Sequence, residues 1–286
     1  MINYLKLVND VLELGHDRPD RTGVGTRSLF GYQTRYNLRN GFPAVTTKKL
    51  AWKGVVSELL WFLEGSTDER RLAEIHYGSS RKDLIGKKTI WTANADVQGK
   101  ELGYINNDLI KELGPVYGSM WRSWGGVGLD QISNVIHTIK NDPFSRRHIV
   151  SAWDPSKIQD MTLPPCHTLF QFYVDDDHLS CQLYQRSADV ALGVPYNIAS
   201  YSLLIHIISK ICDLLPGDFV HSIGDAHVYH NHIDGLTEQL KRVPNKLPGL
   251  KMPDIKTLED VNRSSVNDYV LSNYYPQSSI KFDMIV

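Results

Sequence analysis

The sequence predicts an α+β protein with a single domain over residues 1–286, in which helices flank a mixed β-sheet. Composition is the first reason, because 42% hydrophobic and 22% charged residues in a chain of 286 are typical of a globular protein with a sizeable core. The second is that segments with the two-residue period of strands occur beside segments with helical period. The third is that the sequence has no internal repeats and no low-complexity linkers, which favours one domain.

The helices are predicted from apolar residues that recur every three or four positions. Gly15 and Gly65 follow the first two such stretches and are typical of helix ends. Ser66-Thr-Asp-Glu69 has the pattern of a capping box and predicts that a further helix begins there. The other predicted helices cover residues 5–15, 51–63, 130–140, 196–214 and 229–241.

The strands are predicted from alternating apolar and polar side chains. The alternation is clearest over residues 167–174, and Asp175-Asp-Asp-His178 then has the composition of a hairpin turn, so the next strand should pair with this one. Residues 78–113 are polar and rich in glycine, which predicts a variable surface excursion. The predicted strands cover residues 28–38, 148–153, 167–174, 179–186 and 218–227.

The net charge and the cysteines limit the classes of protein to which the sequence can belong. The formal net charge of −1 argues against a general nucleic-acid-binding protein. The three cysteines, Cys166, Cys181 and Cys212, have no metal-ligand spacing and are typical of a reducing compartment. No apolar run reaches about 18 residues and the first residues do not resemble a signal peptide. We therefore expect a cytoplasmic protein without a membrane partner.

Cys166 follows Pro164 and Pro165 at the start of a predicted strand. Most free cysteines are buried and inert, so a core position is one interpretation. The other is a nucleophile presented at a strand end, and its thiolate would then need a nearby positive charge. His167 is a poor candidate for its base, because successive residues of a strand point to opposite faces.

The partner strand offers that positive charge in Gln185-Arg-Ser-Ala-Asp189. Arg186 beside Cys166 would lower the pKa of the thiol, and with Ser187 it could hold a phosphate. The paired Arg146 and Arg147 at the mouth of another strand also favour phosphate. Asn197 can present a donor and an acceptor side by side, which suits the edge of a uracil-like ring.

Other residues keep two interpretations at this stage. Glu58 in an apolar helix is either at the solvent edge or a buried, functional acid. The aromatic cluster around Tyr117 and Trp121 is either core or a stacking surface for a planar ligand. His227, which shares a strand face with Tyr229, could bind a sugar hydroxyl. Its spacing to the next two histidines is unusual for zinc, so no metal site is expected.

Several motifs resemble, in register, those of the thymidylate synthase family. The resemblance extends from the first helix to the last residue, except over residues 78–113. The motifs are Asp20-Arg-Thr-Gly-Val-Gly-Thr26, Gly41-Phe-Pro-Ala-Val-Thr-Thr-Lys48, Glu58-Leu-Leu-Trp-Phe62, Ser145-Arg-Arg147, Leu163-Pro-Pro-Cys-His167, Gln185-Arg-Ser187, Leu192-Gly-Val-Pro-Tyr-Asn-Ile-Ala-Ser-Tyr201 and Gly224-Asp-Ala-His-Val-Tyr229.

The resemblance implies an α+β homodimer packed sheet to sheet. It also implies reductive methylation of dUMP to dTMP by 5,10-methylenetetrahydrofolate, which becomes dihydrofolate. Cys166 would add to carbon 6 of the uracil, which makes carbon 5 nucleophilic toward the folate methylene. The catalytic residues implied are Cys166, Glu58, Asn197, Tyr117, His167 and Arg186.

The binding residues are carried over from the same motifs. For dUMP they are Arg21, Arg146, Arg147, Cys166, Gln185, Arg186, Ser187, Asp189, Asn197, His227 and Tyr229. Arg146 and Arg147 would come from the partner subunit. For folate they are Lys48, Ile90, Trp91, Leu163, Asp189, Leu192, Gly193, Tyr196 and Ile285, with Lys48 near the glutamate tail.

The chain departs from the family pattern at Thr92-Ala-Asn94, at Gln277-Ser278 and at Ile285. Because all three positions lie where folate is covered, an alternative function is a dUMP hydroxymethylase, in which water captures the methylene intermediate. Trp91 favours methylation, because it would exclude water, and Asn197 argues against a cytidine-using relative. Secondary binding of RNA and a zinc protein are the remaining alternatives.

Overall fold

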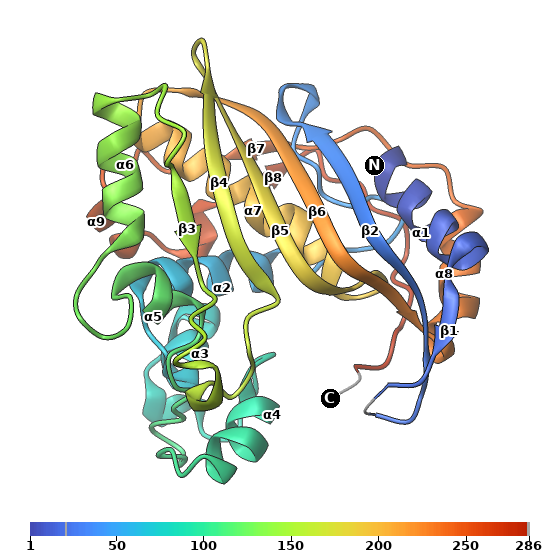
Figure 1. The fold of residues 1–286 in the computed structure, drawn as a ribbon, viewed down its shortest axis with the longest axis horizontal. Coiled ribbons are helices and arrows are strands. Elements are labelled where there is room, and N and C mark those ends of the chain that lie inside the picture. The colour runs from blue at the N-terminus through green and yellow to red at the C-terminus, as the bar shows by residue number, and fades with distance from the viewer. Residues whose placement is uncertain (21, 285–286) are drawn as a thin grey trace.

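The computed structural model describes residues 1–20 and 22–284. A six-stranded sheet runs through the middle of the molecule in the order β1-β2-β6-β5-β4-β3 (Figure 1). Neighbouring strands are antiparallel except for β5 and β6, which are parallel, so the sheet is mixed as expected. The strands are β1 (His16–Arg18), β2 (Thr26–Asn37), β3 (Ile149–Ser151), β4 (His167–Asp175), β5 (His178–Asp189) and β6 (Leu215–Tyr229).

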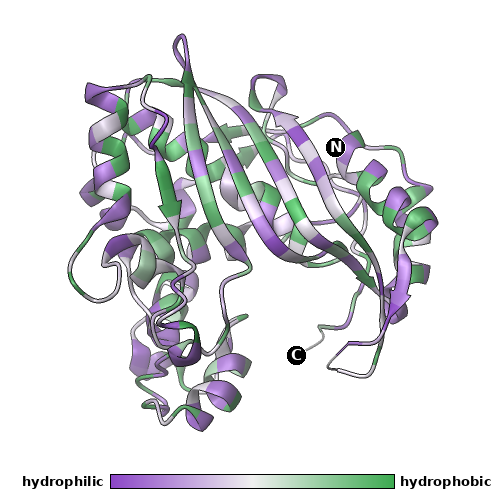
Figure 2. Ribbon diagram, viewed as in Figure 1, coloured by the Kyte–Doolittle hydropathy of each residue, from purple (hydrophilic) through white to green (hydrophobic). Residues whose placement is uncertain are grey.

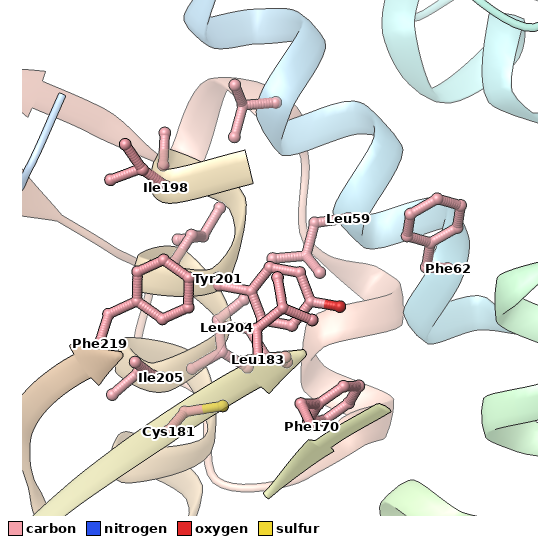
Figure 3. Close-up of a cluster of buried hydrophobic side chains, with 14 of the residues drawn as sticks. Leu59, Phe62, Phe170, Cys181, Leu183, Ile198, Tyr201, Leu204, Ile205 and Phe219 are labelled. Atoms are coloured by element: carbon pink, nitrogen blue, oxygen red, sulfur yellow. The ribbon is translucent and has the colours of Figure 1, made fainter. Parts of the chain in front are cut away.

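The parallel pair requires a crossover, which α7 (Gly193–Ile211) provides behind the sheet (Figure 1). Most of α7 is buried on all sides, because α2 (Trp52–Glu64) covers the face that the sheet leaves. In Figure 3 Tyr201 of α7 lies between Phe219 of β6 and the α2 side chains Leu59 and Phe62. The rings of Tyr201 and Phe219 stack with 5.7 Å between centroids. This cluster forms the centre of the core.

The remaining helices lie around this central unit. Helices α1 and α8 lie beside β2, and α6 lies beside β3 (Figure 1). Their bounds are α1 (Ile2–Leu14), α3 (Glu69–Tyr77), α4 (Thr92–Asn94), α5 (Tyr117–Arg122), α6 (Gln131–Asn141), α8 (Ile233–Leu240) and α9 (Leu258–Arg263). Short turns of helix are η1 (Leu38–Asn40), η2 (Arg81–Leu84), η3 (Ala95–Gly99), η4 (Ile158–Asp160), η5 (His230–His232) and η6 (Val266–Asp268), and β7 (Gly249–Lys251) pairs with β8 (Val270–Ser272).

Among the residues that the structure describes, no helix covers the face of the sheet opposite α7 in Figure 1, and the alternating colours of β4 and β5 in Figure 2 reflect residues that point to opposite faces in turn. Leu169, Tyr173 and Tyr184 point to this face and are 38%, 60% and 41% exposed. Ile149 of β3, opposite Gln171 of β4, is also exposed. These exposed apolar side chains, interspersed with polar ones such as Gln182, make the face a candidate surface for association with another chain.

Most predicted elements are present, but the predicted capping box at residues 66–69 is wrong. Asp68 is the N-cap of α3, and its side chain accepts a hydrogen bond from the backbone N–H of Arg70. Glu69 instead forms a buried ion pair with the Arg70 guanidinium, and both side chains are at most 2% exposed. Capping was predicted from local spacing alone, whereas tertiary contacts decide where Glu69 points.

That ion pair also anchors the segment predicted to be a surface excursion. Arg70 donates to the carbonyl oxygens of Leu84 and Lys87 at 3.2 and 2.9 Å. The hydroxyls of Thr89 and Thr92 each donate to Glu69 Oε1 at 2.6 Å. Residues 84–92 are therefore held against α3, although parts of the wider segment are exposed.

Candidate active site

One end of the sheet collects most of the predicted site residues. Because β4 is antiparallel to β5, the start of β4 lies at the end of β5, and His167 is opposite Gln185. Because β5 and β6 are parallel, their ends coincide, and Asp189 is opposite His227. The start of α7 follows directly from the end of β5, and it carries Asn197 to the same place.

Cys166 is half-buried just before β4. Its backbone N–H donates to the hydroxyl of Tyr117 at 2.8 Å, and its carbonyl oxygen accepts from the backbone N–H of Arg186 at 2.9 Å. Burial raises the pKa of the Cys166 thiol, and the charge of Arg186 and the hydroxyl of Tyr117 act in the opposite direction. The expected effect of Arg186 is present, but burial outweighs it in the single chain.

Arg186 is held by the backbone that precedes the cysteine. Its Nε donates to the carbonyl of Pro165 at 3.1 Å and its Nη2 to that of Pro164 at 2.8 Å. The guanidinium lies 5.6 Å from the ring centre of Trp153. Trp153 was not predicted to be part of the site. The signal that could have found it is its position as an aromatic residue at the end of a predicted strand.

Gln185 connects the cysteine strand to Asn197. It is buried, and its Nε2 donates to the Asn197 side-chain oxygen at 3.1 Å and to the Ser187 carbonyl at 3.0 Å. Its oxygen lies 2.8 Å from Nε2 of His221 on β6. Sequence reasoning missed His221, whose signal is a polar side chain on the same face of an apolar strand as Phe219.

Glu58 is half-buried on α2 rather than fully exposed at its solvent edge. The indole N–H of Trp91 donates to Glu58 Oε1 at 2.7 Å, and Trp91 is only 6% exposed. Burial raises the pKa of Glu58 to about 6, and the hydrogen bond from Trp91 opposes this shift. The ring centres of Trp91 and Tyr117 are 5.9 Å apart, so one aromatic cluster contacts both Glu58 and Cys166.

The aromatic cluster is largely core, as its first interpretation holds. Trp121 and Tyr117 are 1% and 4% exposed, but the Tyr117 hydroxyl contacts Cys166. His167 packs between the rings of Tyr117 and Tyr201, each 5.3 Å away. Burial lowers the pKa of His167 to about 4, so it is neutral at pH 7 and ill suited to take a proton from the thiol.

The histidines that suggested zinc point to different partners. His227 faces Asp225 at 3.6 Å, His230 contacts Asp17 at 3.2 Å, and His232 contacts the backbone of the C-terminal segment. Within residues 1–20 and 22–284, no group of three His, Cys, Asp or Glu side chains is placed to hold a metal ion. The ring of His227 lies 5.3 Å from that of Tyr229, so these two do share one face.

The predicted folate residues lie around the start of α7 and in two separate segments. Asp189 Oδ1 accepts from the N–H groups of Ala191 and Leu192 at 2.8 and 3.1 Å, which fixes the turn before Gly193. Tyr196 is half-buried on the first turn of α7, and Leu163 is half-buried before Cys166. Ile90, beside Trp91, is 60% exposed.

Lys48, which was predicted to lie near the glutamate tail of folate, is buried. It is 5% exposed, its Nζ donates to the Ala191 carbonyl, and the Phe282 ring lies 4.5 Å from it. Burial lowers the pKa of Lys48 to about 8, and Asp189 opposes that shift.

Two predicted phosphate ligands lie far from Cys166 in the same chain. Arg146 and Arg147 are exposed, and the His148 carbonyl that follows them accepts from Phe172 N–H. From Cys166 to Phe172 an extended strand spans about 20 Å. The structure therefore does not bring these arginines to their own cysteine. Arg21 and Ile285 lie outside the described residues.

The sequence is similar to proteins of one known family. A model of the family described as thymidylate synthase matches residues 2–286. The chain belongs to the thymidylate synthase family. It is 47% identical to the thymidylate synthase of Herpesvirus ateles and 46% identical to that of varicella-zoster virus (strain Dumas), over 99% of this chain and 97% and 93% of theirs. It is also 47% identical to a bifunctional dihydrofolate reductase-thymidylate synthase of Zea mays, again over 99% of this chain, and covers 54% of the length of that relative.

Membership confirms the predicted family and the expected class of enzyme, a folate-dependent methyltransferase. Two departures from the family pattern have structural partners in this chain. Thr92 binds the buried Glu69, and Gln277 binds the carbonyl oxygens of Thr46 and Val243 through its backbone and side-chain N–H groups at 2.8 and 2.7 Å. In the part of the chain that the structure describes, no helix has the length and apolar character that crossing a membrane requires.

Proposed function

We propose that this member of the thymidylate synthase family converts dUMP to dTMP with 5,10-methylenetetrahydrofolate, through a covalent bond between Cys166 and carbon 6 of the uracil. The observation that carries the proposal is the position of Cys166, held by Tyr117 and Arg186 at the sheet end where Asn197 is oriented by Gln185. Addition of the thiolate divides one difficult substitution into easier steps. The folate supplies both the one-carbon unit and the hydride.

The nucleotide is placed by charge at one end and hydrogen bonds at the other. Arg186 and Ser187 hold the phosphate, together with Arg21 and with the partner subunit's copies of Arg146 and Arg147. Added cationic groups also favour the thiolate of Cys166, whose pKa burial raises in the single chain. Asn197 meets the uracil edge, and His227 and Tyr229 meet the ribose.

Glu58 serves the proton transfers of the reaction. Its pKa of about 6 lets it exchange protons near neutral pH, and Trp91 fixes its position by a hydrogen bond. Tyr117 and His167 complete a largely buried polar environment beside Cys166. This arrangement limits the access of water to the reacting carbon, which favours methylation over hydroxymethylation.

The residues around the start of α7 suit a planar, partly polar ligand such as folate. Leu192 and Tyr196 are half-buried, Ile90 is exposed, and the Asp189 carboxylate lies at the entrance of the helix. Together these side chains provide apolar contact on one side and hydrogen-bonding groups on the other. Sites with this combination of apolar and polar groups usually bury most of the surface of their ligand.

The site is completed by a second copy of the chain. The open sheet face carries exposed Leu169, Tyr173 and Tyr184, which a sheet-to-sheet homodimer would bury. Arg146 and Arg147 stand at the end of the sheet away from their own Cys166, so a two-fold axis can bring them to the cysteine of the partner. Each site would then contain residues of both chains.

Product analysis tests the activity. The protein is incubated with dUMP and 5,10-methylenetetrahydrofolate, the pyrimidine product is identified by mass, and dihydrofolate is followed by absorbance. We expect dTMP and dihydrofolate in equal amounts. Hydroxymethyl-dUMP without dihydrofolate would show the hydroxymethylase alternative to be correct.

Mixing two inactive variants tests the shared site. Cys166→Ala and the double variant Arg146→Ala/Arg147→Ala are each expected to be inactive as homodimers. After subunit exchange, half of the dimers carry one intact site, so activity should return to about a quarter of the wild-type value. A fully active double variant, or a mixture that exchanges subunits without regaining activity, would contradict the shared site.

A further inference from the structure

His221 is a buried polar residue to which the proposed function assigns no role. It lies within β6 opposite Leu183 of β5 and is 0% exposed. The Phe219 ring packs against it with 5.4 Å between centroids. Its Nε2 is 2.8 Å from Gln185 Oε1, whereas its Nδ1 is buried without a hydrogen-bond partner among the described residues. Because buried polar groups normally have a hydrogen-bond partner, the contact with Gln185 is the one that accommodates this ring in the core.

The directions of the hydrogen bonds in this cluster follow from a backbone carbonyl. The Ser187 carbonyl only accepts, so the group of Gln185 that faces it must be the NH2 group. Gln185 Oε1 then faces His221, and because an amide oxygen only accepts, Nε2 of His221 must carry the proton. The second N–H of Gln185 faces Asn197, so the Asn197 atom at 3.1 Å must be the oxygen.

The protonation state of His221 supports this direction. Burial, together with nearby His167, lowers the pKa of His221 to about 3, so the ring is neutral at pH 7. A neutral imidazole has one donor and one acceptor, and the contact with Gln185 determines which nitrogen is the donor. His221 therefore donates a hydrogen bond to Gln185, and Gln185 donates one to Asn197.

We propose that His221 is a positioning residue that sets, through Gln185, which way the Asn197 amide faces the pyrimidine. The proposal rests on the proposed contact of Asn197 with the base. With its oxygen turned to Gln185, Asn197 has its NH2 group available for a carbonyl oxygen, and the second lone pair of its oxygen available for a ring N–H. A 4-oxo pyrimidine such as uracil matches this pattern. A 4-amino pyrimidine such as cytosine would place a donor against a donor.

The test compares the ratio of the dissociation constants of dUMP and dCMP in matched variants. His221→Phe keeps a buried ring but removes the donor to Gln185, and we expect the preference for dUMP to fall roughly tenfold, as for a lost buried hydrogen bond. His221→Gln places a donor near the position of Nε2 and should restore most of the preference. Phe219→Leu, which disturbs packing on the same strand, should lower the melting temperature without changing the ratio.

Two results would contradict the role of His221 or its premise, and a spectroscopic measurement tests the role if the variant does not fold. An unchanged ratio in a folded His221→Phe protein would show that His221 only packs. A wild-type protein without preference for dUMP would instead remove the proposed function on which the inference rests. If His221→Phe does not fold, nitrogen-15 spectra of the wild-type histidines decide, because a neutral ring protonated at Nε2 is expected for His221 and protonation at Nδ1 would overturn the proposal.

Discussion

The two halves of the candidate site are built in different ways. On the proposed nucleotide side, Cys166, Arg186 and Asn197 lie near the ends of long elements, and the pairing of β4 with β5 fixes the relative positions of the first two. On the proposed folate side, Trp91 belongs to a segment of short helices that does not pair with the sheet within residues 1–20 and 22–284. That segment is held by the buried ion pair of α3. Strand pairing therefore positions the proposed nucleotide side, whereas Trp91 is positioned by packing against Phe62 and Tyr117 and by the polar contacts that hold its segment.

The largest effect is expected from the cysteine. Cys166→Ala should reduce turnover at least about 10⁴-fold, because no covalent adduct can form, while the dissociation constant of dUMP changes little. Stopped assays of dTMP formation and calorimetric titration with dUMP measure the two quantities. Cys181→Ala is the matched control, since Cys181 is buried in the core shown in Figure 3 and should leave turnover per folded molecule unchanged. Retained turnover in Cys166→Ala would contradict the covalent mechanism.

Arg70 anchors the segment that carries Trp91 on the proposed folate side. Arg70→Met leaves Glu69 buried without its partner, and we expect a loss of about 3–5 kcal/mol in the free energy of unfolding. Below the unfolding transition, the KM for the folate should rise more than the KM for dUMP, because residues 84–92 lose their hydrogen bonds to Arg70.

Urea unfolding and steady-state kinetics measure both effects. Arg263→Met removes an exposed partner of Glu259 and should change stability by less than about 1 kcal/mol. Equal changes in the two KM values of Arg70→Met would show that the halves are not separable.

A smaller effect is expected where the two halves meet, at the hydrogen bond from Trp91 to Glu58. This bond opposes the rise in the Glu58 pKa that burial causes, so Trp91→Phe should move that pKa further above about 6. Below its pKa Glu58 is protonated, and steps that need the carboxylate slow down. The acidic limb of the profile of kcat against pH should therefore move to higher pH.

Trp121→Phe is the control for this change, because the Trp121 indole N–H is buried without a partner among the described residues. An acidic limb that stays in place or moves to lower pH in Trp91→Phe would contradict the role of the bond.

Local pattern was enough to predict most of the fold. Alternation located β4 and β5, and the apolar stretch around residues 196–214 corresponds to α7, although its predicted start was three residues late. Glu58 kept two interpretations because its environment depends on Trp91, which is 33 residues away in sequence. Glu69 was assigned to a cap because the pattern around it fitted one, and the tertiary partner was not visible in that pattern.

Most elements, the family and the candidate residues could be predicted from the sequence, because periodicity, turn chemistry and motifs are local properties of the chain. Which candidates lie close together depends on the tertiary structure. The register of β4, β5 and β6 brings Cys166, Arg186 and His227 to one end of the sheet, and it places Arg146 and Arg147 toward the other. The same register places His221 beside Gln185. That contact joins residues 36 positions apart, so it could not be predicted from local sequence.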